Sequence, residues 1–161
     1  MTLERLTNER WGFSSNCFVC EPTNAVGLRQ PFFHDTDHDL VVADLELGFA
    51  HSGAPTFVHG GVQLALLDEA MAWAAIAVAG KFAVTAQFAS TFHHPVRIDR
   101  RYRLEAGIDE RSDASLTAHA RIVDNQDRPR TSATATLVAI SPALAAEAGA
   151  ADPGSASFLR T

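Results

Sequence analysis

The stretch HGGVQLALLDEAMAWAAIAVAG, residues 59–80, decides the fold of this chain. It holds no proline and is rich in alanine, leucine and methionine, so it predicts a helix of about 18 residues from Gly60 to about Ala79. Gly80 is typical of a helix end. Apolar side chains lie on every face of this helix: Val62, Leu64, Leu66, Leu67, Met71, Trp73, Ile76 and Val78. A helix that is apolar all round is buried, so we expect the rest of the chain to enclose it.

The segments on both sides of the helix have the pattern of strands. Residues 39–47 alternate apolar and acidic residues, which predicts a half-buried strand ahead of the helix. After the helix, β-branched and aromatic residues predict further strands over residues 82–93, 102–108, 114–123 and 131–140. Short polar turns separate several of them, so we expect an antiparallel meander. Residues 1–12 predict a short amphipathic helix.

Length and composition indicate one globular domain. The chain has 161 residues, of which 47% are hydrophobic and 20% charged. After Pro142 the sequence becomes rich in alanine, glycine and serine, so we expect a domain over residues 1–142 and a tail with a short helix over 143–161. The net charge of -6 argues against a nucleic-acid partner, which needs a dense basic surface.

The sequence also predicts no membrane partner. The longest apolar stretch, residues 62–79, carries Asp68 and Glu69 near its middle, and a membrane span rarely tolerates such a pair. Residues 1–10 are charged and lack the apolar run of a signal peptide, so we expect a cytoplasmic protein. In that compartment Cys17 and Cys20 are expected as thiols rather than as a disulfide.

Two features of the predicted helix suggest chemistry. Asp68 is a carboxylate in an apolar helix, where a charge is costly unless it has polar partners or lies at an edge in water. Its neighbour Glu69 points about 100° away and is expected as a surface or salt-bridged acid. Gly60-Gly61 lies at the helix N-terminus, where backbone N–H groups are unpaired and the dipole is positive. Bare backbone there suits an oxyanion or a polarised carbonyl; alternatively the glycines only form a tight turn that His59 caps.

Together these residues resemble a known motif. The run His59-Gly60-Gly61-Val62, followed by Leu66-Leu67-Asp68-Glu69-Ala70, is similar to that of hotdog-fold thioesterases, in particular the phenylacetyl-CoA thioesterase branch. The likeness continues in Asn16-Cys17-Phe18-Val19-Cys20, Asn24, Gly27-Leu28, Thr85 and Phe92 to Val96. It covers about residues 13–140. It implies an α+β hotdog fold, in which an antiparallel sheet of five or six strands wraps around one long central helix.

The resemblance implies an acyl-CoA thioesterase, which releases free acid and CoA and needs no cofactor. In such a site the Gly60 N–H polarises the thioester carbonyl, and Asp68 either activates water as a general base or attacks directly as a nucleophile. His59 fixes the turn, and Thr85 hydrogen-bonds the attacking water or Asp68. Further residues are candidates for substrate binding: Gly61 at the turn, Phe57, Met71 and Trp73 for a medium-chain or aromatic acyl group, and Arg97 and Arg100 for the phosphates of CoA. The alternative for the two arginines is a solvated strand end.

Helix geometry adds a prediction about assembly. Gly60 and Asp68 are eight residues apart, so about 12 Å separates them along the helix axis. Attack needs reacting groups about 3 Å apart, so one chain cannot easily bring both onto one thioester. Two antiparallel helices in a homodimer can, which agrees with the dimeric sites that the resemblance implies. A dimer of dimers is the other assembly that we consider.

The chain also departs from the family pattern. Many members carry an amide side chain six residues before the histidine, and this chain has Gly53 there. Either His51 or Ser52 takes over the orienting role, or the role is absent. Glu21 and Ala25 replace the usual glycine and proline of the N-terminal signature. Two other classes therefore stay open: a non-catalytic acyl-CoA-binding module, and a hydratase or dehydratase, although the Phe-Pro turn ahead of the helix is missing.

The cysteines have a second interpretation. Cys17 and Cys20, with His34 and His38, match the spacing of a Cys₂His₂ zinc site. Two prolines and a glycine interrupt the segment between them, so no helix presents the histidines, and we expect no metal. A redox-active pair is disfavoured because no βαβ context surrounds the cysteines.

Overall fold

The computed structural model describes residues 1–12 and 14–149. Its strands are β1 (Leu3–Leu6), β2 (Phe32–Asp35), β3 (Leu40–Glu46), β4 (Ala83–Phe92), β5 (Arg101–Arg111), β6 (Ser115–Val123) and β7 (Pro129–Ala139). Its helices are α1 (Gly60–Ala77) and α2 (Pro142–Glu147), and two short 3₁₀ turns are η1 (Glu9–Trp11) and η2 (Phe49–His51).

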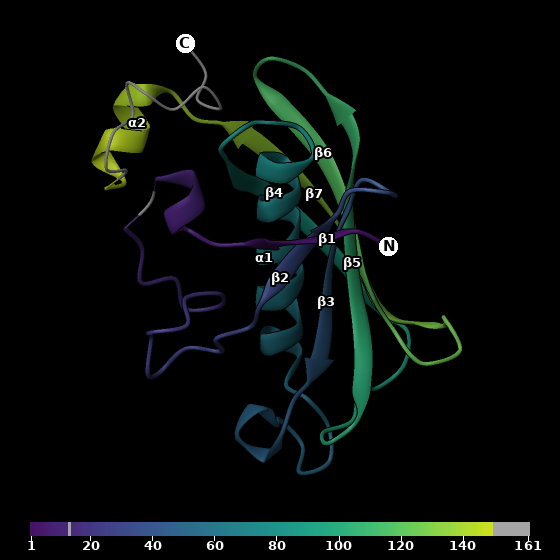
Figure 1. The fold of residues 1–161 in the computed structure, drawn as a ribbon. Helices are drawn as coiled ribbons and strands as arrows, with labels where there is room; N and C mark the ends of the chain where they lie inside the picture. The colour runs from purple at the N-terminus through teal and green to yellow at the C-terminus, as the bar shows by residue number, and fades with distance from the viewer. Residues whose placement is uncertain (13, 150–161) are drawn as a thin grey trace.

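The described strands form one antiparallel sheet in the order β1-β2-β3-β5-β6-β7-β4, and α1 lies along one of its faces (Figure 1). Strand β4 follows α1 in the sequence, but it pairs with β7 at the far end of the sheet. This placement leaves the second edge of β4 without a strand partner among the described residues. The strand that follows the helix is therefore also the strand that closes the sheet on that side.

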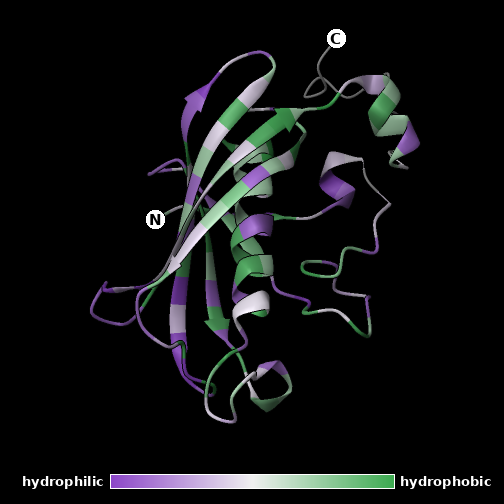
Figure 2. Cartoon of the chain, turned by 180° about the vertical axis from the view of Figure 1, so that it is seen from behind, coloured by the Kyte–Doolittle hydropathy of each residue, from purple (hydrophilic) through white to green (hydrophobic). Residues whose placement is uncertain are grey.

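The core lies between α1 and the inner face of the sheet. Along β6, β7 and most of β5, buried residues alternate with more exposed ones, because successive side chains of a strand point to opposite faces of the sheet. The ribbon in Figure 2 changes between hydrophobic and hydrophilic residues along these strands. Many of the inward residues are alanines, such as Ala118, Ala120 and Ala135, which allow the helix to approach the sheet closely. Leu66 and Leu67 are 0% exposed, and burying such a side chain stabilises a fold by about 1.5–3 kcal/mol.

The opposite side of α1 is covered by the N-terminal segment, residues 14–31 (Figure 1). Val19 is buried in the same core as the helix, and Cys17, Cys20 and Leu28 pack against that core. The Gln30 amide Nε2 donates to the Asp44 carbonyl oxygen at 3.0 Å, which fixes the end of this segment to β3. The helix is thus enclosed on both sides, as its uniform apolarity requires.

Most of the expected elements are confirmed. The helix begins at Gly60 as predicted, and the strand ahead of it and the four strands after it lie within a few residues of the expected ranges. The α+β class with an antiparallel sheet around one long helix is confirmed, but the sheet has seven strands instead of five or six. The meander holds for β5 to β7 only, because β4 crosses over to pair with β7.

The amphipathic helix expected over residues 1–12 is wrong. Residues 3–6 form β1, which pairs with β2 from Leu3 opposite Asp35 to Leu6 opposite Phe32. Only η1 has helical character there. The backbone pairing with a strand some thirty residues away outweighs the local apolar spacing, which is too short to nucleate a stable helix.

The tail begins with α2, in which Ser141 caps the helix and Ala145 is buried. Residues 150–161 lie outside the described range, so the division at residue 142 stays a prediction. Among the described residues, no helix is long and apolar enough to cross a membrane.

Candidate active site

The N-terminus of α1 leaves one backbone donor without a partner. His59 caps the helix: its Nδ1 accepts a hydrogen bond from the Gly61 N–H at 2.8 Å, and its carbonyl oxygen accepts from the N–H groups of Val62 and Gln63 at 3.1 and 3.2 Å. No group of the described residues accepts a hydrogen bond from the Gly60 N–H. This N–H lies at the positive end of the helix dipole, where it can bind an oxygen that gains negative charge.

The glycines around this turn are tightly packed against His59 and Phe92. A Cβ at Gly61 would lie 3.1 Å from His59 Nδ1, and one at Gly53 would lie 3.2 Å from His59 Cδ2. A Cβ at Gly60 would lie 3.3 Å from Cζ of Phe92, whose ring is 52% exposed. A ligand that reaches the Gly60 N–H therefore approaches through space that a larger residue would occupy.

Gln63 fixes the start of the helix to the sheet. It is buried, its Nε2 donates to the Val58 carbonyl oxygen at 3.1 Å, and its Oε1 accepts from the Thr131 hydroxyl on β7. The sequence reasoning missed this residue. The available signal was an amide in the first turn of an otherwise apolar helix, because a buried amide needs satisfied hydrogen bonds.

About two turns after Gly60, Asp68 of α1 pairs with Thr85 of β4. The Thr85 hydroxyl donates to Asp68 Oδ1 at 2.6 Å, a short distance typical of a hydroxyl bound to a carboxylate. No described residue hydrogen-bonds the other carboxylate oxygen of Asp68. The pair opens onto a shallow groove of about 340 Å³, whose other walls are Leu64, Ala65 and Phe88. The half-buried carboxylate is thus oriented by one oxygen and free at the other.

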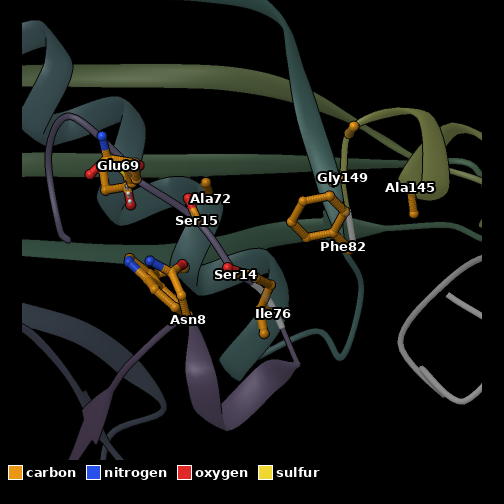
Figure 3. Close-up of a pocket in the computed structure, with 14 residues that line it drawn as sticks. Asn8, Ser14, Ser15, Glu69, Ala72, Ile76, Phe82, Ala145 and Gly149 are labelled. Atoms are coloured by element: carbon orange, nitrogen blue, oxygen red, sulfur yellow. Dashed lines mark hydrogen bonds between the residues drawn. The ribbon is translucent and has the colours of Figure 1, made fainter. Parts of the chain in front are cut away.

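A larger cavity lies on the neighbouring face of α1, where its lining begins at Glu69. Its volume is about 400 Å³. Its apolar lining comes from Ala72, Trp73 and Ile76 of the helix and from Phe82. Its polar lining includes Asn8, and Ser14 and Ser15 of the N-terminal segment (Figure 3).

The remaining residues expected to bind substrate lie at different places. Met71 is fully buried in the core. Phe57 is half-buried, and the Arg97 guanidinium carbon lies 5.2 Å from its ring centre. Arg100 is exposed between Asp99 and β5. Gly61 is at the capped turn described above.

The two residues considered as substitutes for the amide at position 53 are engaged within their own turn. His51 Nδ1 accepts from the Gly48 N–H at 3.1 Å, and the Ser52 hydroxyl donates to the Phe49 carbonyl oxygen at 2.7 Å. Both interactions lie inside η2 and its flanks.

The cysteines and histidines of the N-terminal region do not converge. His34 pairs with Asp39 at 3.0 Å and His38 with Asp35 at 2.9 Å, so no Cys₂His₂ cluster forms among the described residues. Instead, the Cys17 thiol lies 3.3 Å from Oε1 of Glu69.

Glu69 is therefore not the surface or salt-bridged acid that its position on the helix suggested. Burial under the N-terminal segment, followed by the effect of neighbouring Cys17, raises its pKa to about 8. The helix pattern alone could not predict this, because the covering segment is distant in the sequence.

The comparison with protein families names the class. A family model described as the thioesterase superfamily matches residues 56–130. This match assigns the segment that carries α1 and strands β4 to β6 to the thioesterase superfamily and confirms the resemblance to hotdog thioesterases. A comparison with curated proteins gave no match.

Solved structures show the same fold. A thioesterase superfamily protein aligns with a TM-score of 0.67 and 26% identity over 73% of this chain, but over only 57% of its own length. The PaaI protein of E. coli, from the phenylacetic acid degradation operon, aligns with a TM-score of 0.60 and 18% identity over 64% of this chain and 74% of its own. A hypothetical thioesterase from Streptococcus pneumoniae, solved with coenzyme A, aligns with a TM-score of 0.59 and 18% identity over 62% of this chain and 77% of its own. At such identities, the last two matches show a common fold.

Proposed function

We propose that this protein hydrolyses acyl-CoA thioesters to a free acid and CoA. The observation that carries the proposal is the pair of groups left free on α1: the Gly60 N–H at the helix start and one carboxylate oxygen of Asp68 two turns later. A thioester hydrolase needs both a donor for the developing oxyanion and a base or nucleophile.

The chemistry follows from these two groups. The thioester carbonyl oxygen accepts from the Gly60 N–H, which makes the carbonyl carbon more electrophilic. Asp68 removes a proton from water as the water adds to that carbon, and the collapse of the tetrahedral intermediate expels the CoA thiolate, which then takes up a proton. In the second route, Asp68 itself attacks, the C–S bond breaks and the CoA thiolate leaves and takes up a proton from water; water then cleaves the resulting mixed anhydride and restores the Asp68 carboxylate. In either route the Thr85 hydroxyl holds the carboxylate in place through Oδ1.

A homodimer completes the site in this proposal. About 12 Å along the helix axis separates Gly60 from Asp68 within one chain, so they cannot act on the same carbonyl. The exposed edge of the ten-residue strand β4, together with exposed Val84 and Phe92, offers a surface for a second copy beside α1. With the two helices antiparallel, Gly60 of one chain lies near Asp68 of the other. A tetramer would need a second, different interface that joins two such dimers.

Residue types and relatives support the substrate class. The Streptococcus pneumoniae protein was solved with coenzyme A. Two variants of it were also solved, one with an aspartate and one with a threonine replaced by alanine, and these are the two residue types that pair here. The cavity beyond Asp68 has apolar walls that include Trp73 and Phe82, which suit a medium-chain or aromatic acyl group. Arg97, stacked on Phe57, and Arg100 are available for the CoA phosphates.

A panel of acyl-CoA substrates, followed by release of free thiol, tests the proposal. We expect thiol release from saturated and aromatic acyl-CoAs alike. Hydration of an enoyl-CoA without thiol release would support a hydratase instead, and tight binding of acyl-CoA with no turnover would support a binding module. Either result would overturn the hydrolase.

A further inference from the structure

Three ligand-type side chains that the proposed hydrolysis does not use converge on one point. The two sulfurs of Cys17 and Cys20 and a carboxylate oxygen of Glu69 all lie within 4.8 Å of one another. The cysteines come from the N-terminal segment and Glu69 from α1, so the chain brings them together only on folding. We propose that Cys17, Cys20 and Glu69 bind a thiophilic divalent cation, zinc being the class that this donor set fits best.

The donor set has the chemistry of a zinc site. Zinc takes cysteine thiolates at about 2.3 Å and carboxylate oxygens at about 2.0–2.2 Å in a tetrahedron, which places ligand atoms roughly 3.4–3.8 Å apart. The Cys17 sulfur is already 3.3 Å from Glu69 Oε1, so only small side-chain shifts are needed to seat the ion. The two-residue spacing of the cysteines also falls within the range that zinc sites use.

Each sulfur has a hydrogen-bond donor beside it. The backbone N–H of Val19 donates to the Cys17 sulfur at 3.4 Å, and the Asn8 side-chain amide lies 3.7 Å from the Cys20 sulfur as a donor. Donors of this kind orient a ligating sulfur. No lysine or arginine of residues 1–12 and 14–149 forms an ion pair with Glu69, so no basic side chain competes with a cation for this carboxyl group.

The fourth coordination position faces the cavity beside α1. Cys17 and Glu69 both line this cavity, together with Ser14 and Ser15; Figure 3 shows Glu69 and the two serines. Three protein ligands and one position open to water satisfy a tetrahedral ion. Glu69 thus takes the place that the sequence pattern gave to His34 and His38, and this replaces the expectation of a metal-free protein.

The ion would link two parts of the chain that are distant in the sequence. It ties the N-terminal segment to the helix turn that carries Asp68, and a site that exists only in the folded chain contributes its binding free energy to stability. The inference does not depend on the hydrolase proposal, because its test reads metal binding rather than turnover.

Titration of the full, reduced, metal-free chain with Co²⁺ tests the site. We expect intense visible bands of tetrahedral Co²⁺ and a near-ultraviolet thiolate-to-metal band, both reaching a plateau at one ion per chain and both removed by stoichiometric Zn²⁺. Cys17→Ser and Cys20→Ser should abolish the thiolate band. Glu69→Gln, which keeps the shape of the side chain, should weaken Co²⁺ binding by at least about tenfold.

His34→Gln and His38→Gln are the matched controls, and both should keep the spectrum of the unaltered chain. Circular dichroism of each variant verifies its fold, and the Glu69→Gln result decides the matter if a cysteine variant does not fold. Absence of the thiolate band with both thiols verified as reduced would refute the site. So would an unchanged affinity in Glu69→Gln, or loss of the bands in a folded histidine variant.

Discussion

Replacement of Asp68 by asparagine removes a charge and little else. Asparagine keeps an oxygen at the Oδ1 position, so the Thr85 hydroxyl still has its acceptor. The bond changes from charge-assisted to neutral, which we expect to change the free energy of unfolding by no more than about 1 kcal/mol at this partly exposed position. The variant should therefore remain folded at assay temperature.

The rate should fall far more than the stability. Asparagine can neither take the proton of water nor attack the thioester, and loss of such a group costs at least about a hundredfold in rate, or about 2.7 kcal/mol in the activation barrier. The assay is thiol release from an acyl-CoA, with a substrate-free blank because the chain itself carries two cysteines. Most of the loss should appear in kcat and little in KM.

Asp109→Asn is the matched control. Asp109 is another carboxylate in a short hydrogen bond, 2.7 Å from His119 Nδ1, but it lies exposed on β5 away from the groove. This control should keep its activity. If Asp68→Asn also kept most of the rate, Asp68 would be structural, and the mechanism in which it attacks or activates water would be wrong.

Two further predictions address a positioning residue and the sheet. Thr85→Val keeps the shape of the side chain but removes the donor to Asp68, so kcat should fall by about tenfold, whereas Thr85→Ser should restore it; equal rates in both variants would argue against a positioning role. Burial by itself would raise the pKa of Asp124, but the N–H groups of Arg128 and Gln126 and the Arg128 side chain outweigh it and hold this pKa below its usual range. Ionised Asp124 therefore stabilises the fold above the unfolded pKa of about 3.9, and this contribution is lost as pH falls below it. Asp124→Asn should lower the melting temperature at pH 7, with a gap to the unaltered chain that closes under acid; Asp127→Asn, in the same turn but exposed, should change it little, and a gap independent of pH would contradict the argument.

Sequence patterns within one segment predicted the helix and most of the strands. The apolar helix and the strands over 82–140 follow from composition and alternation, and His59, Gly60 and Asp68 stand out because their residue types are unusual for a buried helix. Strands β1 and β2 are only four residues long, and their pairing joins distant parts of the chain. No window of the sequence contains that information.

The same limit applies to the sites. Glu69 is next to Asp68 on the helix, and only the N-terminal segment packed over it makes it a buried neighbour of Cys17. Gln63 gains its role from Thr131 on β7, a contact between distant residues. Strand β4 reaches the edge of the sheet because it crosses over to β7, and periodicity does not reveal strand order.

The central claim is that one chain supplies the Gly60 N–H and the other supplies Asp68, and a mixture of two inactive variants tests it most directly. Gly60→Val places bulk where the carbonyl must approach, against the ring of the partly exposed Phe92. Asp68→Asn removes the carboxylate. Each variant alone should be inactive, and circular dichroism should show both folded.

After verified subunit exchange, random mixing makes roughly half of the dimers mixed, each with one intact site and one doubly altered site, so activity should return towards about a quarter of the unaltered protein. An exchanged mixture that stays inactive would place both groups in one chain and contradict the shared site.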